Sequence, residues 1–595
     1  MGIKGRKVIS VFAVLLLLVS ASWAQVKGTS KRGKTDKRTS LEAARRRQAI
    51  AQGAGAAKAK AMRPAAGSAK RGAMSRSAPG AVGGSAEVPV AVARNVGVFD
   101  ADDDDGIISP NLIDAAVLAT LRERGIEPAK LCSDEVFIRR VYLDVIGTLP
   151  EPQEVQKFLQ DRRPGKRAAL IDALLEREEF ADYWALKWCD LLRVKAEFPI
   201  NLWPNAVQAY HRWIRDSIRE NKPYDQFVRA LLTSSGSNFR VAPVNFYRAI
   251  QGRDPSAIAA AVALTFMGTR MESWPQDRRL GMAAFFSRIA YRETAEWKEE
   301  IVCLNPASST TVEAVFPDGR AVRIPPGEDP RRVFTDWLVT PDNPWFARNI
   351  VNRVWAWLMG RGIIHEPDDI RPDNPPANPQ LLALLEKELV KANWDLRHIY
   401  RLILNSRTYQ QSPIPRSNHP DVEALFACYP VRRLDAEVLI DALDWIGGTG
   451  ENYESLIPEP FTFIPQSHRT IALADGSISS SFLEMFGRPA RDTGLESERN
   501  NQPTDSQRLH LLNSTDVQRR IEQSARLRNL TAATKGNRRA LISSIYLIIL
   551  SRYPTPAELA AAEKYSQTPG LNPTTQAAND LAWALINTKE FLYRH

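Results

Sequence analysis

The sequence predicts a mainly α-helical fold, with two helical domains and a small β-hairpin insert, preceded by a signal peptide and a disordered basic tail. Three observations support this prediction. Apolar residues recur at helical spacing over residues 111–595, a helix–turn–helix segment is repeated within the chain, and one segment alternates clearly as a strand does. With 595 residues, 44% of them hydrophobic, the chain has room for about two to four domains with substantial cores.

Residues 1–24 have the three parts of a secretory signal peptide. Lys4, Arg6 and Lys7 form a positively charged start, residues 8–19 are apolar, and Ser22-Trp23-Ala24 is a small-x-small cleavage site. The apolar part spans about a dozen residues, which is short for a membrane-spanning helix. We therefore expect export to the periplasm or the cell exterior, and no transmembrane segment in the mature chain.

Residues 25–110 form a predicted linker. Its first part, residues 25–95, holds 16 Lys and Arg against three Asp and Glu and lacks aromatic residues, which is typical of disorder. Subtracting its +13 and the +3 of residues 1–24 from the formal +11 leaves −5 for residues 96–595, so we expect no nucleic-acid partner. The basic tail is either a solvated tether or a contact with an anionic envelope surface or polysaccharide.

The linker ends in an acidic run, Asp102 to Asp105, that is followed by Gly106. An EF-hand calcium loop would place Ala101 at its first ligand position and Leu112 at its twelfth, and neither side chain can bind calcium. We interpret the run as a hinge.

Residues 111–300 are the first predicted helical domain. Ser133 suits the N-cap of one helix, and Pro150 separates that helix from a second one that runs through Phe158. Aromatic-rich helices are expected at residues 183–192, 206–218 and 224–232. Three tryptophans in this region are more typical of a core than of a binding surface: Trp184, Trp188 and Trp213.

An internal repeat supports the helical prediction. Residues 138–155 (IRRVYLDVIGTLPEPQEV) align without gaps with residues 542–559 (ISSIYLIILSRYPTPAEL), and residues 399–409 are a looser echo. In the second copy Thr555, Pro556 and Glu558 have the form of a capping box with proline at the first helical position. We interpret this helix, proline-marked turn and helix as a structural unit.

Residues 301–330 are the predicted β-hairpin connector, because residues 311–324 alternate around an Asp318-Gly319 turn. Residues 331–595 are the second predicted helical domain. Within it, residues 448–478 are rich in loops, helices resume at Thr504, and Ser479-Ser480-Ser481 is interpreted as a helix cap.

Residues 343–360 predict an amphipathic helix near the centre of the chain. Pro344 suits its first turn, and Gly360 and Gly362 follow its end. Its polar face is expected either to be solvated or to bond a neighbouring loop, and residues 366–369 form an acidic loop that suits its arginines. That face carries Arg348, Asn349, Asn352 and Arg353.

Three runs from this region resemble a family of exported bacterial proteins expanded in planctomycetes and their relatives. They are DNPWFARNIVNRVWAWLMGRGI at 342–363, PDDIRPDNPPANPQLLALLEKEL at 367–389 and WDLRHIYRLILNSRTYQQS at 394–412. In that family an N-terminal planctomycete cytochrome C domain precedes a C-terminal planctomycete-specific domain, both of unknown function. The resemblance covers most of residues 110–595 and implies no particular reaction.

The resemblance also implies two cysteine clusters that this chain lacks. A Cys-x-x-Cys-His run, which attaches haem, would stand between residues 265–271 and Trp274, where only Glu272 and Ser273 lie. A Cys-x-Cys pair would stand at Leu495 and Ser497, after residues 486–489 (FGRP). We therefore expect no haem and no other cofactor, and hypothesise that both clusters once served a single metal or redox site.

Other chemistry-bearing patterns are scarce. The seven histidines show no metal-ligand spacing, and the chain contains no G-x-S-x-G, Walker or dinucleotide-binding motif. The best polar group is His365 with Asp368 and Asp369, facing Arg348, Asn352 and Arg353. It is either a hydrolase site, with histidine, carboxylates and an arginine clamp, or a buried salt-bridge network that holds a loop to its helix.

Four widely spaced cysteines allow up to two disulfides in an oxidising compartment or remain small buried thiols: Cys132, Cys189, Cys303 and Cys428. No metal site is expected from them. The function expected is that of a non-catalytic scaffold or binding protein of the cell envelope, engaging a polysaccharide or an unidentified partner protein. The alternative is an envelope enzyme, either a hydrolase using His365 or a redox protein with an unrecognised site.

Overall fold

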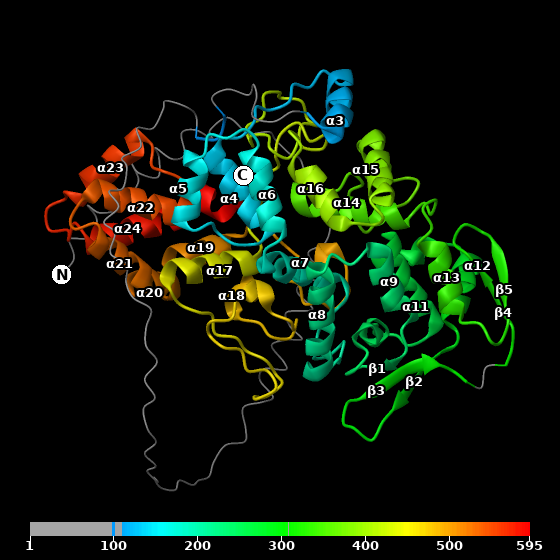
Figure 1. Cartoon of the computed structure of the whole chain (residues 1–595). Helices are drawn as coiled ribbons and strands as arrows, with labels where there is room; N and C mark the ends of the chain where they lie inside the picture. The colour runs from blue at the N-terminus through cyan, green and yellow to red at the C-terminus, as the bar shows by residue number, and fades with distance from the viewer. Residues whose placement is uncertain (1–97, 102–109, 307–308) are drawn as a thin grey trace, which may run out of the picture. The chain divides into compact units, whose positions relative to one another are not determined.

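Helices dominate the computed structural model, which describes residues 98–101, 110–306 and 309–595 (Figure 1). The predicted signal peptide at 1–24, the basic tail at 25–95 and the acidic run at 102–105 lie outside the described residues. The described residues all belong to one compact unit. None of the helices that the structure describes combines the length and the apolar character needed for a membrane span.

The N-terminal half of this unit begins with a succession of helices. Ser133 caps α4, as predicted, by accepting a hydrogen bond from the Val136 N–H. Trp184 and Trp188 are buried in the core and Trp213 is half-buried. The longer helices are α3 (Leu112–Glu123), α4 (Asp134–Val145), α5 (Pro152–Gln160), α6 (Lys166–Leu175), α7 (Glu178–Leu191), α8 (Pro204–Arg219), α9 (Tyr224–Thr233), α11 (Pro255–Val262) and α12 (Gln276–Ala283).

Short helical turns connect these helices. They are η2 (Ala242–Val244), α10 (Asn245–Arg248), the π-helix η3 (Ala263–Met267), η4 (Met271–Ser273) and η5 (Ala284–Phe286). The helix predicted at residues 183–192 begins five residues earlier, at Glu178, because Phe180 and Ala181 continue its buried face.

The predicted hairpin is present as β4 (Val312–Val315) paired with β5 (Ala321–Ile324). A second, three-stranded antiparallel sheet was not predicted; it has the order β1 (Gly236–Ser237), β3 (Glu300–Leu304) and β2 (Ile289–Glu293). Its strands are short, and the turn between β2 and β3 lacks the Asn-Gly or Asp-Gly signal that marks the other hairpin. A two-residue pairing of β6 (Arg432–Arg433) with β7 (Tyr593–Arg594) joins the end of the chain to its middle.

The C-terminal half is again helical. The loop-rich prediction for residues 448–478 agrees with the structure, as do the helix caps at Ser480 and Thr504. The helices are α13 (Pro330–Leu338), α14 (Phe346–Met359), α15 (Pro379–Lys391), α16 (Leu396–Leu404), α17 (Ala436–Gly447), η6 (Thr470–Ala472), α18 (Ser481–Met485), η7 (Glu496–Glu498), α19 (Asp505–Asn513), α20 (Thr515–Glu522), α21 (Ala525–Ala533), α22 (Arg538–Leu550), α23 (Pro556–Ser566), α24 (Thr575–Ile586) and α25 (Lys589–Leu592).

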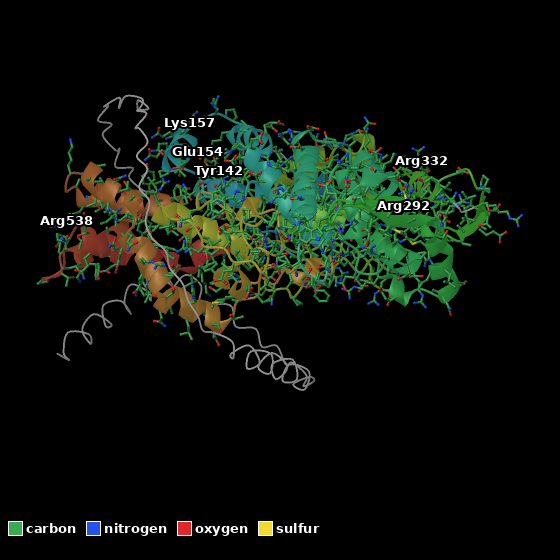
Figure 2. All side chains as sticks on the ribbon, turned by 90° about the horizontal axis from the view of Figure 1, so that it is seen from below. Tyr142, Glu154, Lys157, Arg292, Arg332 and Arg538 are labelled. Carbon is green, nitrogen blue, oxygen red and sulfur yellow. The ribbon has the colours of Figure 1, made fainter. Side chains whose placement is uncertain are left out.

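The two copies of the repeat, α4–α5 and α22–α23, form the same local structure. Each first helix ends at a left-handed residue, Gly147 with φ +62° and Ser551 with φ +58°. Each second helix starts with a capping box, completed by Glu154 in one copy and Glu558 in the other. Figure 2 shows Tyr142 of α4 beside Glu154 of α5, with which it forms a hydrogen bond. The two copies meet where α22 packs against α5.

Candidate functional site

On the polar face of α14, Asn349, Asn352 and Arg353 are buried and contact neighbouring segments. The helix begins at Phe346 and not at the predicted residue 343, because the Asn343 side chain caps the preceding turn by accepting the N–H groups of Trp345 and Phe346. Asn352 clamps Ile364, donating to its carbonyl at 3.0 Å and accepting its N–H at 2.9 Å. Of the two expectations for this face, hydrogen bonding to a neighbouring loop is the one that the structure supports.

Arg353 and Asp368 form a buried ion pair at the centre of this contact. Arg353 Nη2 lies 2.5 Å from Asp368 Oδ1, and the two side chains are 1% and 0% exposed. The same Nη2 donates to the Leu264 carbonyl in η3 at 3.0 Å. The second Asp368 oxygen accepts the Glu496 N–H at 2.6 Å. The pair therefore joins α14, η3, residues 367–370 and η7.

Residues 367–370 also contact the flank that precedes the position where the resemblance would place a haem-binding run. The Ile370 N–H donates to the Gly268 carbonyl at 2.8 Å, and Thr269 Oγ1 donates to the Ile370 carbonyl at 3.0 Å. On the other side, Glu496 stands between Leu495 and Ser497, the positions of the second implied cysteine pair. Residues 367–370 thus contact both the flank before the first implied cluster and the residue between the second implied pair.

The residues now at these positions do not fit a covalently attached haem. Attachment needs two thiols and an imidazole ligand, whereas η4 consists of Met271, Glu272 and Ser273. Across the described ranges, no group of three or more His, Cys, Asp or Glu side chains is arranged to hold a metal ion. All four cysteines are free; Cys132, Cys189 and Cys428 are buried, as the thiol interpretation predicts, while Cys303 is half-buried. Burial raises the pKa of the Cys189 and Cys428 thiols to about 12.

The six candidate catalytic residues separate into an inner and an outer group. Asn352, Arg353 and Asp368 are buried as described. The outer residues have other partners: the His365 ring is 37% exposed and lies 3.8 Å from Glu366, Asp369 lies 3.3 Å from Arg371, and Arg348 lies 2.8 Å from Glu386. Burial, assisted by Arg361, lowers the pKa of His365.

A larger buried charge network lies beyond these candidates and was not found from the sequence. Its acidic centres are Asp190 in α7, Asp435 before α17, and Glu437 in α17. Asp435 accepts Lys187 at 2.9 Å and Arg594 at 3.1 Å. Further ion pairs of the network are Asp190 with Arg491 at 2.8 Å, Asp190 with Arg499 at 2.7 Å, and Glu437 with Arg499 at 2.7 Å.

The electrostatics of this network keep its carboxylates charged although they are buried. Burial alone would raise the pKa of Asp435, but Lys187, Arg594 and Arg499 outweigh it and hold that pKa well below its usual range. Burial lowers the pKa of Lys187 in turn. In the sequence, only the charged run that contains Arg491, after FGRP, pointed to this network. Its partner Asp190 is 301 positions away, so the pairing could not be read from local sequence.

Two family models match the chain. One, described as PSCyt2, a protein of unknown function (DUF1549), matches residues 112–288. The other, described as PSD1, a protein of unknown function (DUF1553), matches residues 330–566. Neither the curated proteins nor the solved structures contain a match to this chain.

Proposed function

The chain belongs to the planctomycete family that joins an N-terminal PSCyt2 domain to a C-terminal PSD1 domain, and from this premise we propose that it is a non-catalytic binding or scaffold protein of the cell envelope. The observation that carries the proposal is the buried pair of Arg353 and Asp368. Both residues belong to the candidate catalytic group, and their contacts join four chain segments. The charges of Arg353 and Asp368 therefore stabilise the fold.

Export and attachment to the envelope are part of this proposal. They are supported by the signal-peptide pattern of residues 1–24 and by the net +13 of residues 25–95. Basic residues near an anionic surface contribute about 1 kcal/mol each, and salt screens this attraction. The name of the PSCyt2 domain suggests a cytochrome-like origin. This chain contains no Cys-x-x-Cys-His run, so it has lost the residues that would attach haem.

Cell fractionation tests the proposal. We expect the full-length chain in the envelope fraction, about 0.5 M NaCl to weaken this association by screening the basic tail, and a variant lacking residues 25–95 to be released more readily into the soluble exported fraction. Absorption and metal analysis of the natively purified protein belong to the same experiment. Stoichiometric iron or copper, a Soret band, or retention of the chain in the cytoplasm would contradict the proposal.

A hydrolase centred on His365 is the second candidate, because this ring is partly exposed and its lowered pKa keeps it neutral near pH 7. Chromogenic esters, phosphates and glycosides test it. Turnover that His365→Ala abolishes, without a change in melting temperature, would establish the enzyme. We expect no turnover that depends on this residue, with His419→Ala as the matched histidine control.

A further inference from the structure

Three loops expose large apolar side chains at one place on the surface. One loop precedes α8, one is the turn between β2 and β3, and one follows α17 (Figure 1). Together they form what we call the aromatic patch: Phe198, Trp203, Trp297, Leu456, Phe461 and Phe463. Leu456 is 90% exposed, Phe198 81% and Trp297 66%. Apolar groups gathered from separate loops at such exposure mark an interaction surface.

Ring contacts and hydrogen bonds hold the three loops together. The Trp203 ring packs edge to face against Trp297, with 4.5 Å between centroids, and lies 5.7 Å from Phe461. The Glu197 carboxylate accepts the Ser455 hydroxyl and the Leu456 N–H, both at 2.8 Å. Phe198 and Leu456 therefore lie on neighbouring loops that are fixed to each other.

The backbone at the centre of the patch is strained. Trp203 has φ +72° and ψ 147°, a conformation normally restricted to glycine. Such a conformation persists only where the surroundings enforce it, and here it sets the ring between Trp297 and Phe461. A half-buried tryptophan held in this way supports the outer side chains from beneath.

The rim of the patch is acidic on balance. Glu296, Glu454 and Glu459 are exposed. Lys298 lies over the Trp297 ring, 5.6 Å from its centroid, and Arg240 lies 3.9 Å from Glu296. An anionic partner, whether nucleic acid or acidic lipid, would meet net repulsion at this rim.

We propose that the aromatic patch inserts into the interfacial layer of a membrane whose headgroups are zwitterionic. Tryptophan and phenylalanine favour this layer, and lipid, being fluid, surrounds separately projecting side chains without needing a complementary cavity. Leucine and phenylalanine offer no hydrogen bonds to a sugar, so the composition favours lipid over polysaccharide. This inference rests on the proposed binding role in the envelope and names the partner.

The test uses the full-length mature chain with phosphatidylcholine–phosphatidylethanolamine vesicles in about 0.5 M NaCl, which screens the attraction of the basic tail. We expect co-sedimentation and a blue shift of tryptophan fluorescence. Trp297→Ala and Leu456→Ser should each lower the partition coefficient about tenfold, which corresponds to about 1.4 kcal/mol. Leu509→Ser changes a leucine that is 59% exposed elsewhere, on α19, and should leave partitioning within about twofold.

Four results would overturn the inference. They are an absence of partitioning by the unaltered chain, an equal effect of Leu509→Ser, saturable quenching of tryptophan fluorescence by cellohexaose or chitohexaose, and concentration-dependent self-association that Trp297→Ala abolishes. Melting curves of each variant show whether it is folded. Any of these failures leaves the fractionation and metal results of the proposed function unchanged, so the two proposals fail separately.

Discussion

Asp368 illustrates how one residue can be assigned a role from its neighbours. By type it suits a hydrolase, but it is fully buried between the Arg353 side chain and the Glu496 N–H. Removing one member of a buried ion pair leaves the other charge without compensation, which costs more than the pair itself contributes. The effect of substitution at Asp368 should therefore be on stability.

We expect Asp368→Asn to lower the free energy of unfolding by about 3 kcal/mol, because Arg353 would remain buried without its counter-ion. Urea unfolding followed by circular dichroism measures this. Asp369→Asn is the matched control, since Asp369 is 26% exposed and pairs with the half-exposed Arg371; its cost should stay below about 1 kcal/mol. Equal costs for the two variants would show that the Asp368 contacts are not special.

His211 makes stability depend on pH. Burial, with Arg491 and Arg215 nearby, lowers its pKa from 6.5 to about 3. The folded state therefore holds a neutral ring between these values, whereas the unfolded chain takes up a proton below 6.5, so stability falls as pH drops through this window.

We expect His211→Gln to flatten the dependence of the free energy of unfolding on pH between about pH 6 and 3, which urea unfolding at several pH values measures. The contribution removed approaches about 1.4 kcal/mol per pH unit. His419→Gln, at a ring that is 35% exposed, is the control and should leave the slope close to that of the unaltered chain. A slope unchanged by His211→Gln would show that other groups determine the acid sensitivity.

Among the elements, the duplicated unit is where local sequence determines local structure most directly. The capping box at Thr555 and Glu558 forms as its spacing predicts, and the left-handed residue that ends each first helix recurs at Gly147 and Ser551. Gly147 has an additional constraint, because a Cβ there would lie 2.7 Å from the Tyr183 ring.

Gly147→Ala should therefore destabilise the fold by about 2–4 kcal/mol, combining backbone strain with overpacking against Tyr183. Gly125→Ala provides the comparison, since Gly125 has φ +65° but no atom within 4 Å of its added Cβ. That variant should cost about 1 kcal/mol, from the backbone alone. The difference between the two melting temperatures isolates the steric part.

The helices could be predicted from the sequence more completely than the site, for a physical reason. Periodicity and caps are local, so helices such as α4, α14 and α22 were predictable to within a few residues. The short strands β1 and β2 carry too little pattern, and they depend on pairing with β3. The ion pair of Asp368 with Arg353 spans 15 positions and could be anticipated, but its bond to Glu496 spans 128 positions and could not.

For the whole molecule, the segments matched by the two family models pack on one another. α22 contacts α5, and Lys187 of α7 pairs with Asp435 beside α17. The Arg139 side chain of α4 donates to the carbonyls of Ile549 and Phe591. Contacts of this kind couple the stability of both regions.

We therefore expect residues 98–595 to unfold in one cooperative transition, with equal calorimetric and van't Hoff enthalpies. Lys187→Met leaves Asp435 with fewer counter-charges. It should lower the temperature of the single unfolding transition without splitting that transition in two. Two resolved heat-absorption peaks would show that the regions are thermodynamically independent. Lys387→Met, on α15, serves as a control at an exposed lysine.

The burial of Asp190 against Arg491 and Arg499 has an evolutionary consequence. A single inherited replacement at any of these sites leaves a charge in a medium that cannot solvate it, so such a lineage passes through a less stable intermediate. Replacements at the three positions should therefore be correlated among relatives, and chimaeras that exchange one half between distant relatives should misfold more often than either parent.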